Sequence, residues 1–283
     1  MIRFAALLAT LFLFTGCHDE PTAAEEKTQY SRIVTLAPHL AELVFAVGAG
    51  DSIVGVSAYS DFPAEVASIP IVSDAFTVDQ EQLALVKPDL LLAWESGMPA
   101  STVGEIRALG YRVEVIRTRG LSDIAAALRR VGSLTGRDSA GEEAARVFTQ
   151  ALDTLRAANS DKRRLDVFYQ ISQQPLYTVN GEHYISEILD ICGGNNVFAD
   201  LDEFAPNVSA EAVIARQPDV ILAAEGSTDF DVWRRWETLP AAVSESFYAL
   251  PADETGRPTP RVLVAADEAC AALDDARDRV PAP

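Results

Sequence analysis

The chain alternates short apolar runs with segments of helical periodicity, and this alternation constrains its fold more than any other feature. Residues 33–36, 53–56 and 90–93 are rich in β-branched residues or leucine and predict buried strands. Apolar residues recur at helical spacing in 38–47 and 103–109, and a glycine follows each segment. Strands that are apolar along their whole length and alternate with helices indicate a parallel sheet covered on both faces.

A long stretch without any strand signal interrupts the alternation. In residues 139–158 apolar residues recur at helical spacing, which corresponds to roughly 30 Å of helix. After a charged segment at 161–164, a second α/β series begins. We therefore predict an α/β protein of two Rossmann-like lobes with parallel sheets, residues 31–137 and 161–283, joined by one long helix at 138–160.

The two expected lobes share an internal repeat. Glu81 precedes Pro88-Asp89 at the same distance at which Glu211 precedes Pro218-Asp219, and an apolar strand follows each pair. Pro-Asp before a strand is common turn chemistry. The matched upstream glutamates nevertheless favour a true repeat, and hence approximate two-fold symmetry between the lobes.

The N-terminal segment predicts export. An unbroken apolar run follows Arg3, is too short to span a membrane as a helix, and is typical of a signal segment. The run ends in a sequence similar to a bacterial lipobox, so we expect residues 1–17 to be a signal segment and Cys17 to be lipidated. An ordinary signal peptide with an incidental Cys17 is the alternative. Residues 18–30 are polar and acidic and are expected to be a flexible tether. The protein is therefore expected in the periplasm, tethered to a membrane if Cys17 carries lipid.

Charge and motifs exclude several classes of function. The formal net charge of −19 argues against nucleic-acid binding, which needs clustered lysine and arginine. The sequence has no Gly-x-Ser-x-Gly, no phosphate-binding glycine loop, no Cys-x-x-Cys and no His-x-x-x-His. We accordingly expect a monomer without catalytic residues, metal site or cofactor. His39 follows Pro38 at a predicted helix start, where it either faces the space between the lobes or is an ordinary surface imidazole.

The cysteines that follow the expected signal segment are Cys192 and Cys270. In an exported protein two cysteines are expected to form one disulfide, which would contribute roughly 4 kcal/mol because the loop it closes is long. A catalytic thiol is disfavoured in an oxidising compartment.

Aromatic residues in expected loops are the best candidates for ligand contacts. Tyr59 and Trp94 follow predicted strands, Phe76 lies in a strandless stretch, and Tyr177 offers a partner from the second lobe. Ligands of open parallel sheets lie beyond the carboxyl ends of the strands. Rings gathered there suit a large, partly apolar ligand, although packing in the core is the ordinary role of any one of them.

Several segments together resemble the cobalamin-binding periplasmic proteins of ABC importers. That family has the single-helix-hinge (class III) solute-binding fold, which is similar to that of chelatases. The resemblance covers nearly the whole exported chain and is carried by residues 32–43, 59–63, 87–90, 93–94, 175–178, 192–198 and 259–261.

The resemblance implies roles for individual residues. Tyr59 matches a cobalamin-contacting tyrosine and Trp94 matches a cleft tryptophan. Two other cleft tryptophans of the family are replaced, at Ala75 and Ala205, and the adjacent Phe76 and Phe204 become candidate contacts. A ligand-contacting segment of the second lobe is matched by Asp253, Glu254, Thr255, Gly256 and Arg257.

Two further implications concern the partner and the disulfide. Glu81 and Glu211 match two acids, one on each lobe, that meet arginines of the membrane permease. Complementary charge of this kind fixes the register of docking. Cys192 and Cys270 match the disulfide of the family.

The sequence thus predicts a solute-binding protein that captures cobalamin or a related corrinoid between its lobes and delivers it to the permease subunits of an ABC importer. A ferric-siderophore or haem receptor of the same fold is the first alternative. It would need a basic or metal-ligating cleft, for which Arg257, Arg261, His39 and Tyr59 are the candidates. An enzyme on a chelatase-like scaffold is the second, with Asp61, Asp253 and His39 as its candidate acid-base groups.

Overall fold

The computed structural model describes residues 29–74, 77–227 and 229–281. The expected signal segment with Cys17, nearly all of the expected tether, and Phe76 lie outside these residues. Within the described part of the chain, no helix combines the length and apolarity needed to cross a membrane.

The first lobe is a parallel sheet covered on both faces. Its strand order is β3-β2-β1-β4-β5, and every neighbouring pair is parallel. The helices α1 and α4 pack on one face, while α2 and α3 pack on the other. Short 3₁₀ turns occupy Gly50–Ser52 and Ala64–Ser68. The elements are β1 Ile33–Thr35, α1 Pro38–Ala46, β2 Ile53–Ser57, β3 Ile71–Ser73, α2 Gln80–Val86, β4 Leu90–Trp94, α3 Ala100–Ala108, β5 Val113–Ile116 and α4 Leu121–Leu134.

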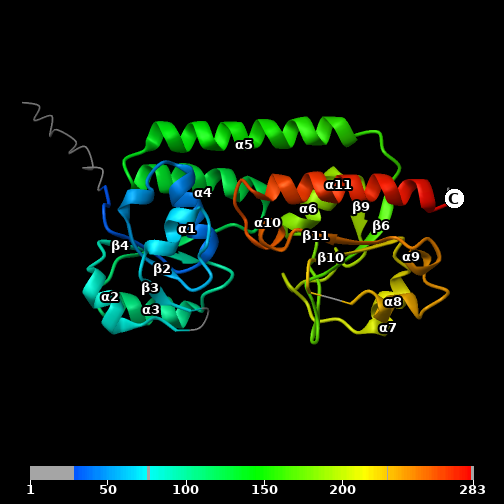
Figure 1. Cartoon of the computed structure of the whole chain (residues 1–283), viewed down its shortest axis with the longest axis horizontal. Helices are drawn as coiled ribbons and strands as arrows, with labels where there is room; N and C mark the ends of the chain where they lie inside the picture. The colour runs from blue at the N-terminus through cyan, green and yellow to red at the C-terminus, as the bar shows by residue number, and fades with distance from the viewer. Residues whose placement is uncertain (1–28, 75–76, 228, 282–283) are drawn as a thin grey trace, which may run out of the picture.

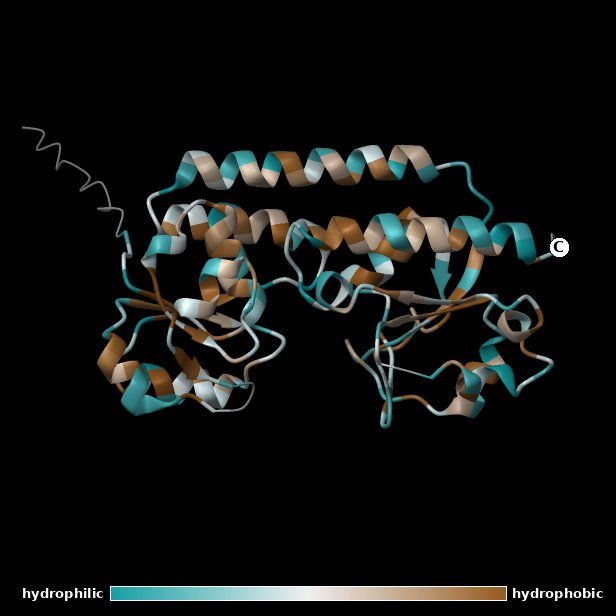
Figure 2. Cartoon of the chain, viewed as in Figure 1, coloured by the Kyte–Doolittle hydropathy of each residue, from teal (hydrophilic) through white to brown (hydrophobic). Residues whose placement is uncertain are grey.

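The second lobe repeats this plan with four parallel strands in the order β11-β10-β6-β9. A small antiparallel hairpin, β7-β8, follows β6. Figure 2 shows most strands of both sheets in hydrophobic colours, as expected for strands buried on both faces, whereas the edge strand β9 is hydrophilic. The elements are β6 Leu165–Gln170, β7 Ser172–Gln173, β8 Leu176–Tyr177, α6 Tyr184–Ile191, β9 Gly194–Asn196, α7 Ala210–Arg216, β10 Val220–Ala224, α8 Asp231–Arg234, α9 Pro240–Val243, β11 Phe247–Leu250, α10 Ala252–Gly256 and α11 Val262–Arg279.

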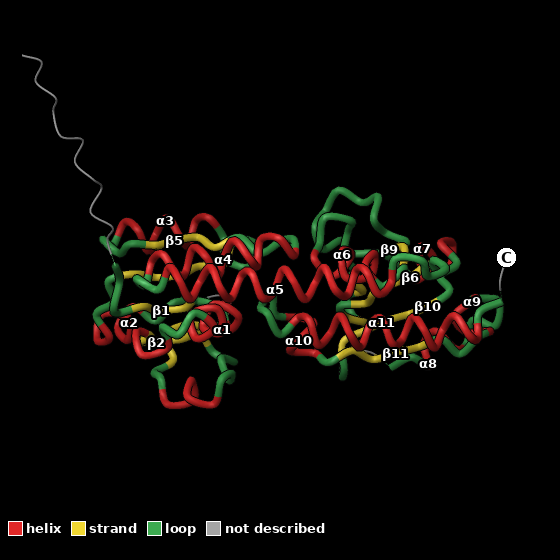
Figure 3. The backbone as a smooth tube through the Cα atoms, turned by 90° about the horizontal axis from the view of Figure 1, so that it is seen from above, coloured by secondary structure: helices red, strands yellow, loops and turns green. Residues whose placement is uncertain are grey.

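One helix connects the lobes. Helix α5, Asp138–Asn159, has 22 residues and runs along the molecule over both lobes (Figures 1 and 3). It packs on α4 in the first lobe and on α11 in the second. Gly132 and Gly141 let α4 and α5 meet backbone to backbone, because a Cβ on Gly132 would lie 2.9 Å from the Cα of Gly141. Phe148 and Leu152 of α5 lie in a core that continues from one lobe into the other.

The internal repeat is confirmed, and the structure explains its Pro-Asp pair. Both α2 and α7 end at a residue in the left-handed region, Lys87 with φ 45° and Gln217 with φ 47°. The Asp89 carboxylate accepts a hydrogen bond from the N–H of Arg32 at 3.0 Å, and the Asp219 carboxylate accepts one from the N–H of Asp166 at 2.9 Å. Each aspartate therefore ties the start of its own strand to the neighbouring strand of the same sheet.

Most expected strands and helices are confirmed to within a few residues. Strand β3 was not predicted, because its three residues, Ile71–Ser73, are too few to show a periodicity. The hairpin β7-β8 was missed for the same reason.

The disulfide between Cys192 and Cys270 is present, with a Cα–Cα distance of 4.7 Å. Cys192 follows α6 and Cys270 lies on α11, and both are buried. The bridge joins residues 78 apart in sequence and so fastens α11 to the body of the second lobe.

We expect the double variant Cys192→Ala with Cys270→Ala to lower the free energy of unfolding by about 4 kcal/mol, because the bridge restricts a long loop in the unfolded chain. Urea denaturation followed by circular dichroism measures the change. Identical denaturation midpoints for the variant and the oxidised protein would show that the bridge contributes nothing to stability.

Candidate functional site

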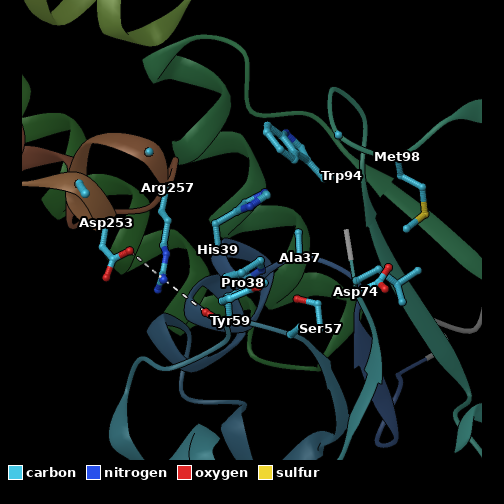
Figure 4. Close-up of a pocket in the computed structure, with 15 residues that line it drawn as sticks. Ala37, Pro38, His39, Ser57, Tyr59, Asp74, Trp94, Met98, Asp253 and Arg257 are labelled. Atoms are coloured by element: carbon cyan, nitrogen blue, oxygen red, sulfur yellow. Dashed lines mark hydrogen bonds and ion pairs between the residues drawn. The ribbon is translucent and has the colours of Figure 1, made fainter. Parts of the chain in front are cut away.

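The main pocket lies between the lobes. It encloses about 360 Å³. The first lobe contributes the segments that follow β1, β2, β3 and β4, and the second lobe contributes α10 (Figure 4). These segments of the first lobe lie at the carboxyl ends of its strands, where ligands of parallel sheets are expected. Both lobes therefore supply walls to one cavity.

Tyr59 stands at the open side of this pocket. It follows β2 with φ 64°, in the left-handed region that is uncommon for a bulky residue, and its side chain is 82% exposed. The Tyr59 carbonyl accepts a hydrogen bond from Nη2 of Arg257 at 3.3 Å. The second lobe thus helps to hold the loop that presents this ring.

Trp94 and His39 form another wall of the pocket. Trp94 is the last residue of β4, and its ring meets that of His39 edge-on with centroids 4.9 Å apart. The indole lies on Gly97, where a Cβ would come within 2.1 Å of it. His39 is buried at the start of α1, and burial lowers its pKa to about 3, with the charge of Arg257 as a second cause. The imidazole is therefore neutral at physiological pH.

A buried carboxylate joins the lobes beside the pocket. The side chain of Glu42 on α1 is 3% exposed. Its Oε1 accepts hydrogen bonds from Nη1 of Arg257 and Nη1 of Arg261, both at 3.1 Å, and its Oε2 accepts one from the Thr259 hydroxyl at 2.9 Å. All three donors belong to the second lobe. We call Glu42 together with Arg257, Thr259 and Arg261 the interlobe cluster.

Arg257 is further engaged by two aspartates. Its Nη1 donates to Asp61 at 2.5 Å and its Nη2 lies 2.9 Å from Asp253. Hydrogen bonding to Arg257 is the main cause that lowers the pKa of Asp61. Burial alone would lower the pKa of Arg257, but its bonds to Asp61 and Glu42 outweigh burial and raise it. The guanidinium is accordingly a permanent cation whose charge is already compensated.

Five of the expected ligand contacts line the pocket: Tyr59, Trp94, Asp253, Gly256 and Arg257. Other members of the expected set lie elsewhere. The carboxylate of Glu254 pairs with Arg261, and the Thr255 hydroxyl, which is buried, donates to the carbonyl of Pro251 at 2.6 Å. These two residues anchor α10 instead of facing the cavity.

Tyr177 and Phe204 also lie outside the lining of this pocket. Tyr177 is in β8 and is 37% exposed. Phe204 stacks on His183 with centroids 4.4 Å apart, and the guanidinium of Arg119 lies over its ring at 4.5 Å. Their roles in ligand binding stay predictions.

Sequence reasoning missed several lining residues. Ala37 and Pro38 follow β1, Ser57 ends β2, Asp74 follows β3, and Met98 comes shortly after β4. These positions also lie at the carboxyl ends of strands, which is the criterion that selected Tyr59 and Trp94. Their side chains, however, are not large aromatic rings, so nothing in the sequence marked them as ligand contacts.

The residues that the structure describes contain no group of three or more His, Cys, Asp or Glu side chains that could hold a metal ion.

The two glutamates that are expected to dock on the permease are notable for their position. Glu81 and Glu211 are exposed in the first turns of α2 and α7, behind the helix caps Asp79 and Ser209. Helices α2 and α7 both lie on the side of the molecule away from α5 (Figure 1).

Comparison with known proteins identifies the family to which the chain belongs. Residues 33–254 match the model of the family described as periplasmic binding protein. The chain is 35% identical over 269 residues to the vitamin B12-binding protein of Vibrio cholerae serotype O1, which covers 94% of this chain and 96% of the relative. It is 36% identical over 251 residues to the vitamin B12-binding protein of Vibrio parahaemolyticus, covering 88% and 90%.

Among solved structures, the chain is similar to the crystal structure of the periplasmic vitamin B12 binding protein BtuF of Vibrio cholerae. The TM-score is 0.80 at 35% identity, and the match covers 88% of this chain and 99% of that one. The two-lobed α/β architecture with parallel sheets is thereby confirmed.

We expect Glu42→Gln to lower the free energy of unfolding by about 2 kcal/mol, because a buried acceptor loses its charge-assisted hydrogen bonds to two guanidinium groups, which keep only Asp61, Asp253 and Glu254 as counter-charges. The matched control is Glu143→Gln, which removes a carboxylate from an exposed pair with Arg146 on α5 and should leave the denaturation midpoint unchanged. Equal midpoints for Glu42→Gln and the control would remove the structural role assigned to the interlobe cluster.

Proposed function

Since the chain belongs to the periplasmic binding protein family, we propose that it captures cobalamin or a related cobalt corrinoid in the pocket between its lobes and delivers it to the permease subunits of an ABC importer. One observation carries the choice of ligand. The described walls of the pocket carry the rings of Tyr59 and Trp94 among mostly small or apolar residues, and the guanidinium of Arg257 in these walls is already paired with carboxylates.

A corrinoid fits these walls chemically. It is a large ring system whose rim carries neutral carboxamides. Rings such as Tyr59 and Trp94 bury apolar area at small entropic cost, and they suit a ligand of this kind. Because Tyr59 is largely exposed, the cavity is open along that side. A ligand larger than the cavity can therefore extend from it into solvent.

The charge of the site disfavours the first alternative. Haem carries propionates and many ferric siderophores are anionic, so their receptors need free basic groups. Here Arg257 and Arg261 are both bound to Glu42, and Arg261 is also paired with Glu254. The carboxylates of Asp74 and Asp253 line the same pocket. An anionic ligand would therefore find the guanidinium of the described lining already paired with carboxylates.

The second alternative, an enzyme, finds no support in the titratable groups. A general acid or base works best with a pKa near the operating pH. Burial holds the pKa of His39 at about 3, and Arg257 lowers that of Asp61. Both groups thus keep one protonation state around neutral pH. The relatives reported above are binding proteins as well.

We assign direct ligand contact to the five predicted residues that line the pocket, namely Tyr59, Trp94, Asp253, Gly256 and Arg257. Glu254 and Thr255 support them by holding α10. Tyr177, Phe204 and Phe76 are proposed to contact parts of the ligand that extend beyond the cavity. The protein acts in the periplasm as a monomer, and Cys17 is proposed to carry the lipid that tethers it to a membrane.

Glu81 and Glu211 are proposed to dock the protein on its transporter. The repeat gives each lobe an equivalent exposed carboxylate, and a dimeric permease can offer two equivalent basic sites. The pKa of Glu211 is lowered by a backbone hydrogen bond at its own N–H and by Ser209, so this group stays ionised. Charge complementarity at such positions governs the encounter and its register more than affinity.

Titration with cyanocobalamin tests the ligand. We expect binding at micromolar concentration or below, and we expect Tyr59→Ala and Trp94→Ala each to weaken it by about 10-fold or more, the size of effect typical of a buried aromatic anchor. Trp236→Ala is the control, because Trp236 is an exposed tryptophan outside this pocket. Binding of haem or a ferric siderophore, with no binding of cyanocobalamin, would reassign the ligand.

Reversal of the two docking acids tests the partner. Glu81→Lys with Glu211→Lys should leave the affinity for cyanocobalamin unchanged and abolish the stimulation of ATP hydrolysis by the cognate transporter in proteoliposomes. The control, Glu142→Lys with Glu143→Lys, makes the same change in net charge on α5. Stimulation that survives in the first double variant would refute docking through these acids.

A further inference from the structure

The two buried imidazoles of the described chain are in different situations. His183 is used by the fold: its Nδ1 accepts a hydrogen bond from the N–H of Ile185 at 3.2 Å and caps α6, and its ring stacks on Phe204. His39 also begins a helix, but its side chain does not cap it. Its Nε2 is buried without a hydrogen-bond partner.

An unpartnered buried nitrogen is costly and needs an explanation, since buried polar side-chain atoms are nearly always hydrogen-bonded. His39 is 3% exposed and lines the pocket together with Trp94, toward which its imidazole points in Figure 4. Nε1 of Trp94 lacks a partner too. Two ring nitrogens in the wall of the pocket therefore make no hydrogen bond within the protein.

The chemistry of His39 suits a metal centre. A neutral imidazole with its proton on Nδ1 has a lone pair on Nε2, and imidazole is the commonest metal ligand among side chains. The metal would be that of the ligand, since no group of three or more His, Cys, Asp or Glu side chains in the described part of the chain could hold one.

We propose that Nε2 of His39 is an axial ligand of the cobalt ion in corrinoids that arrive with an exchangeable axial position. The inference rests on the proposed corrinoid function and narrows the ligand to a subclass. This subclass contains corrinoids with water bound to cobalt, and among them cobinamides, which lack the nucleotide base. In the binding step the cobalt–water bond breaks, a cobalt–nitrogen bond forms and water leaves. Cobalt keeps its oxidation state.

Trp94 controls access to this nitrogen. Its indole lies edge-on against the imidazole, and no hydrogen bond from Nε1 holds it there. Rotation of the indole uncovers Nε2, and the ring can then lie against the corrin. In its present position the indole packs directly on Gly97, where a Cβ would come within 2.1 Å of the ring, so rotation of the indole means leaving this contact.

The test compares three corrinoids on the same protein by visible spectroscopy and equilibrium titration. Diaquocobinamide has exchangeable positions, dicyanocobinamide has both positions filled by cyanide, and cyanocobalamin is filled by cyanide and its own base. We expect diaquocobinamide to change from its aquo spectrum to that of an imidazole complex when the wild-type protein binds it. In His39→Gln the change should be absent, and the preference for diaquocobinamide over dicyanocobinamide should fall by about 10- to 100-fold or more, at least the loss seen when the supporting residues of a metal ligand are removed.

Two controls keep the outcome interpretable. His183→Asn alters the other buried imidazole and should preserve the spectral change, since asparagine can still cap α6. Cyanocobalamin titration reports whether each variant still folds and binds. If wild-type protein binds cyanocobalamin but bound diaquocobinamide keeps its aquo spectrum, or if His39→Gln retains the change, His39 is not the ligand and the proposed function stands. If no corrinoid binds, the proposed function itself fails.

Discussion

The site depends on one buried carboxylate. Glu42 lies on α1 in the first lobe, yet its hydrogen-bond partners all belong to the second lobe: Arg257, Thr259 and Arg261. A carboxylate buried to this extent is tolerable only because several charged and polar donors surround it. The same Arg257 reaches Asp61 and the carbonyl of Tyr59. The contact that fixes the lobes relative to each other is therefore also the contact that shapes the mouth of the pocket.

A second polar contact between the lobes also fixes their relative position. The N–H of Leu121, at the start of α4, donates to the carboxylate of Glu187 on α6 at 3.2 Å, so a helix of one lobe is capped by a side chain of the other. Burial raises the pKa of Glu187. Helix α5 adds a continuous apolar core that passes beneath it from lobe to lobe. With polar ties beside the pocket and a packed helix behind it, the lobes are positioned before any ligand arrives, and closure around the ligand should be small.

The fold could be predicted from the sequence because its signals are local and repeated. All-apolar runs predicted the strands, and the stretch without a strand signal at 139–158 predicted α5. The paired Pro-Asp motifs predicted the two-fold relation between the lobes, and Asp89 and Asp219 explain it through matching hydrogen bonds. The site was only partly predictable. Position at a strand end selected Tyr59 and Trp94, which line the pocket, but membership of the segment 253–257 could not distinguish the residues of that segment that line it from Glu254 and Thr255. Burial of Glu42 was invisible as well, because its partners lie more than two hundred residues away and sequence spacing carries no trace of them.

The chemistry of the pocket follows from what its polar groups have already bound. Arg257, Asp61 and Glu42 satisfy one another, and a cation bonded in this way is a poor receptor for an anion and a poor acid catalyst. Beside these paired groups, the described lining offers the rings of Tyr59 and Trp94, several small and apolar residues, and two ring nitrogens without hydrogen-bond partners, on His39 and Trp94. A protein that must release its ligand intact gains from such a site, because the affinity for the ligand comes mainly from surface contact and not from bonds to reactive groups. His39 is the exception in this set. Its nitrogen can form a bond to a ligand, but only to one that carries a metal with a position to exchange, so the exception adds selectivity without adding catalysis.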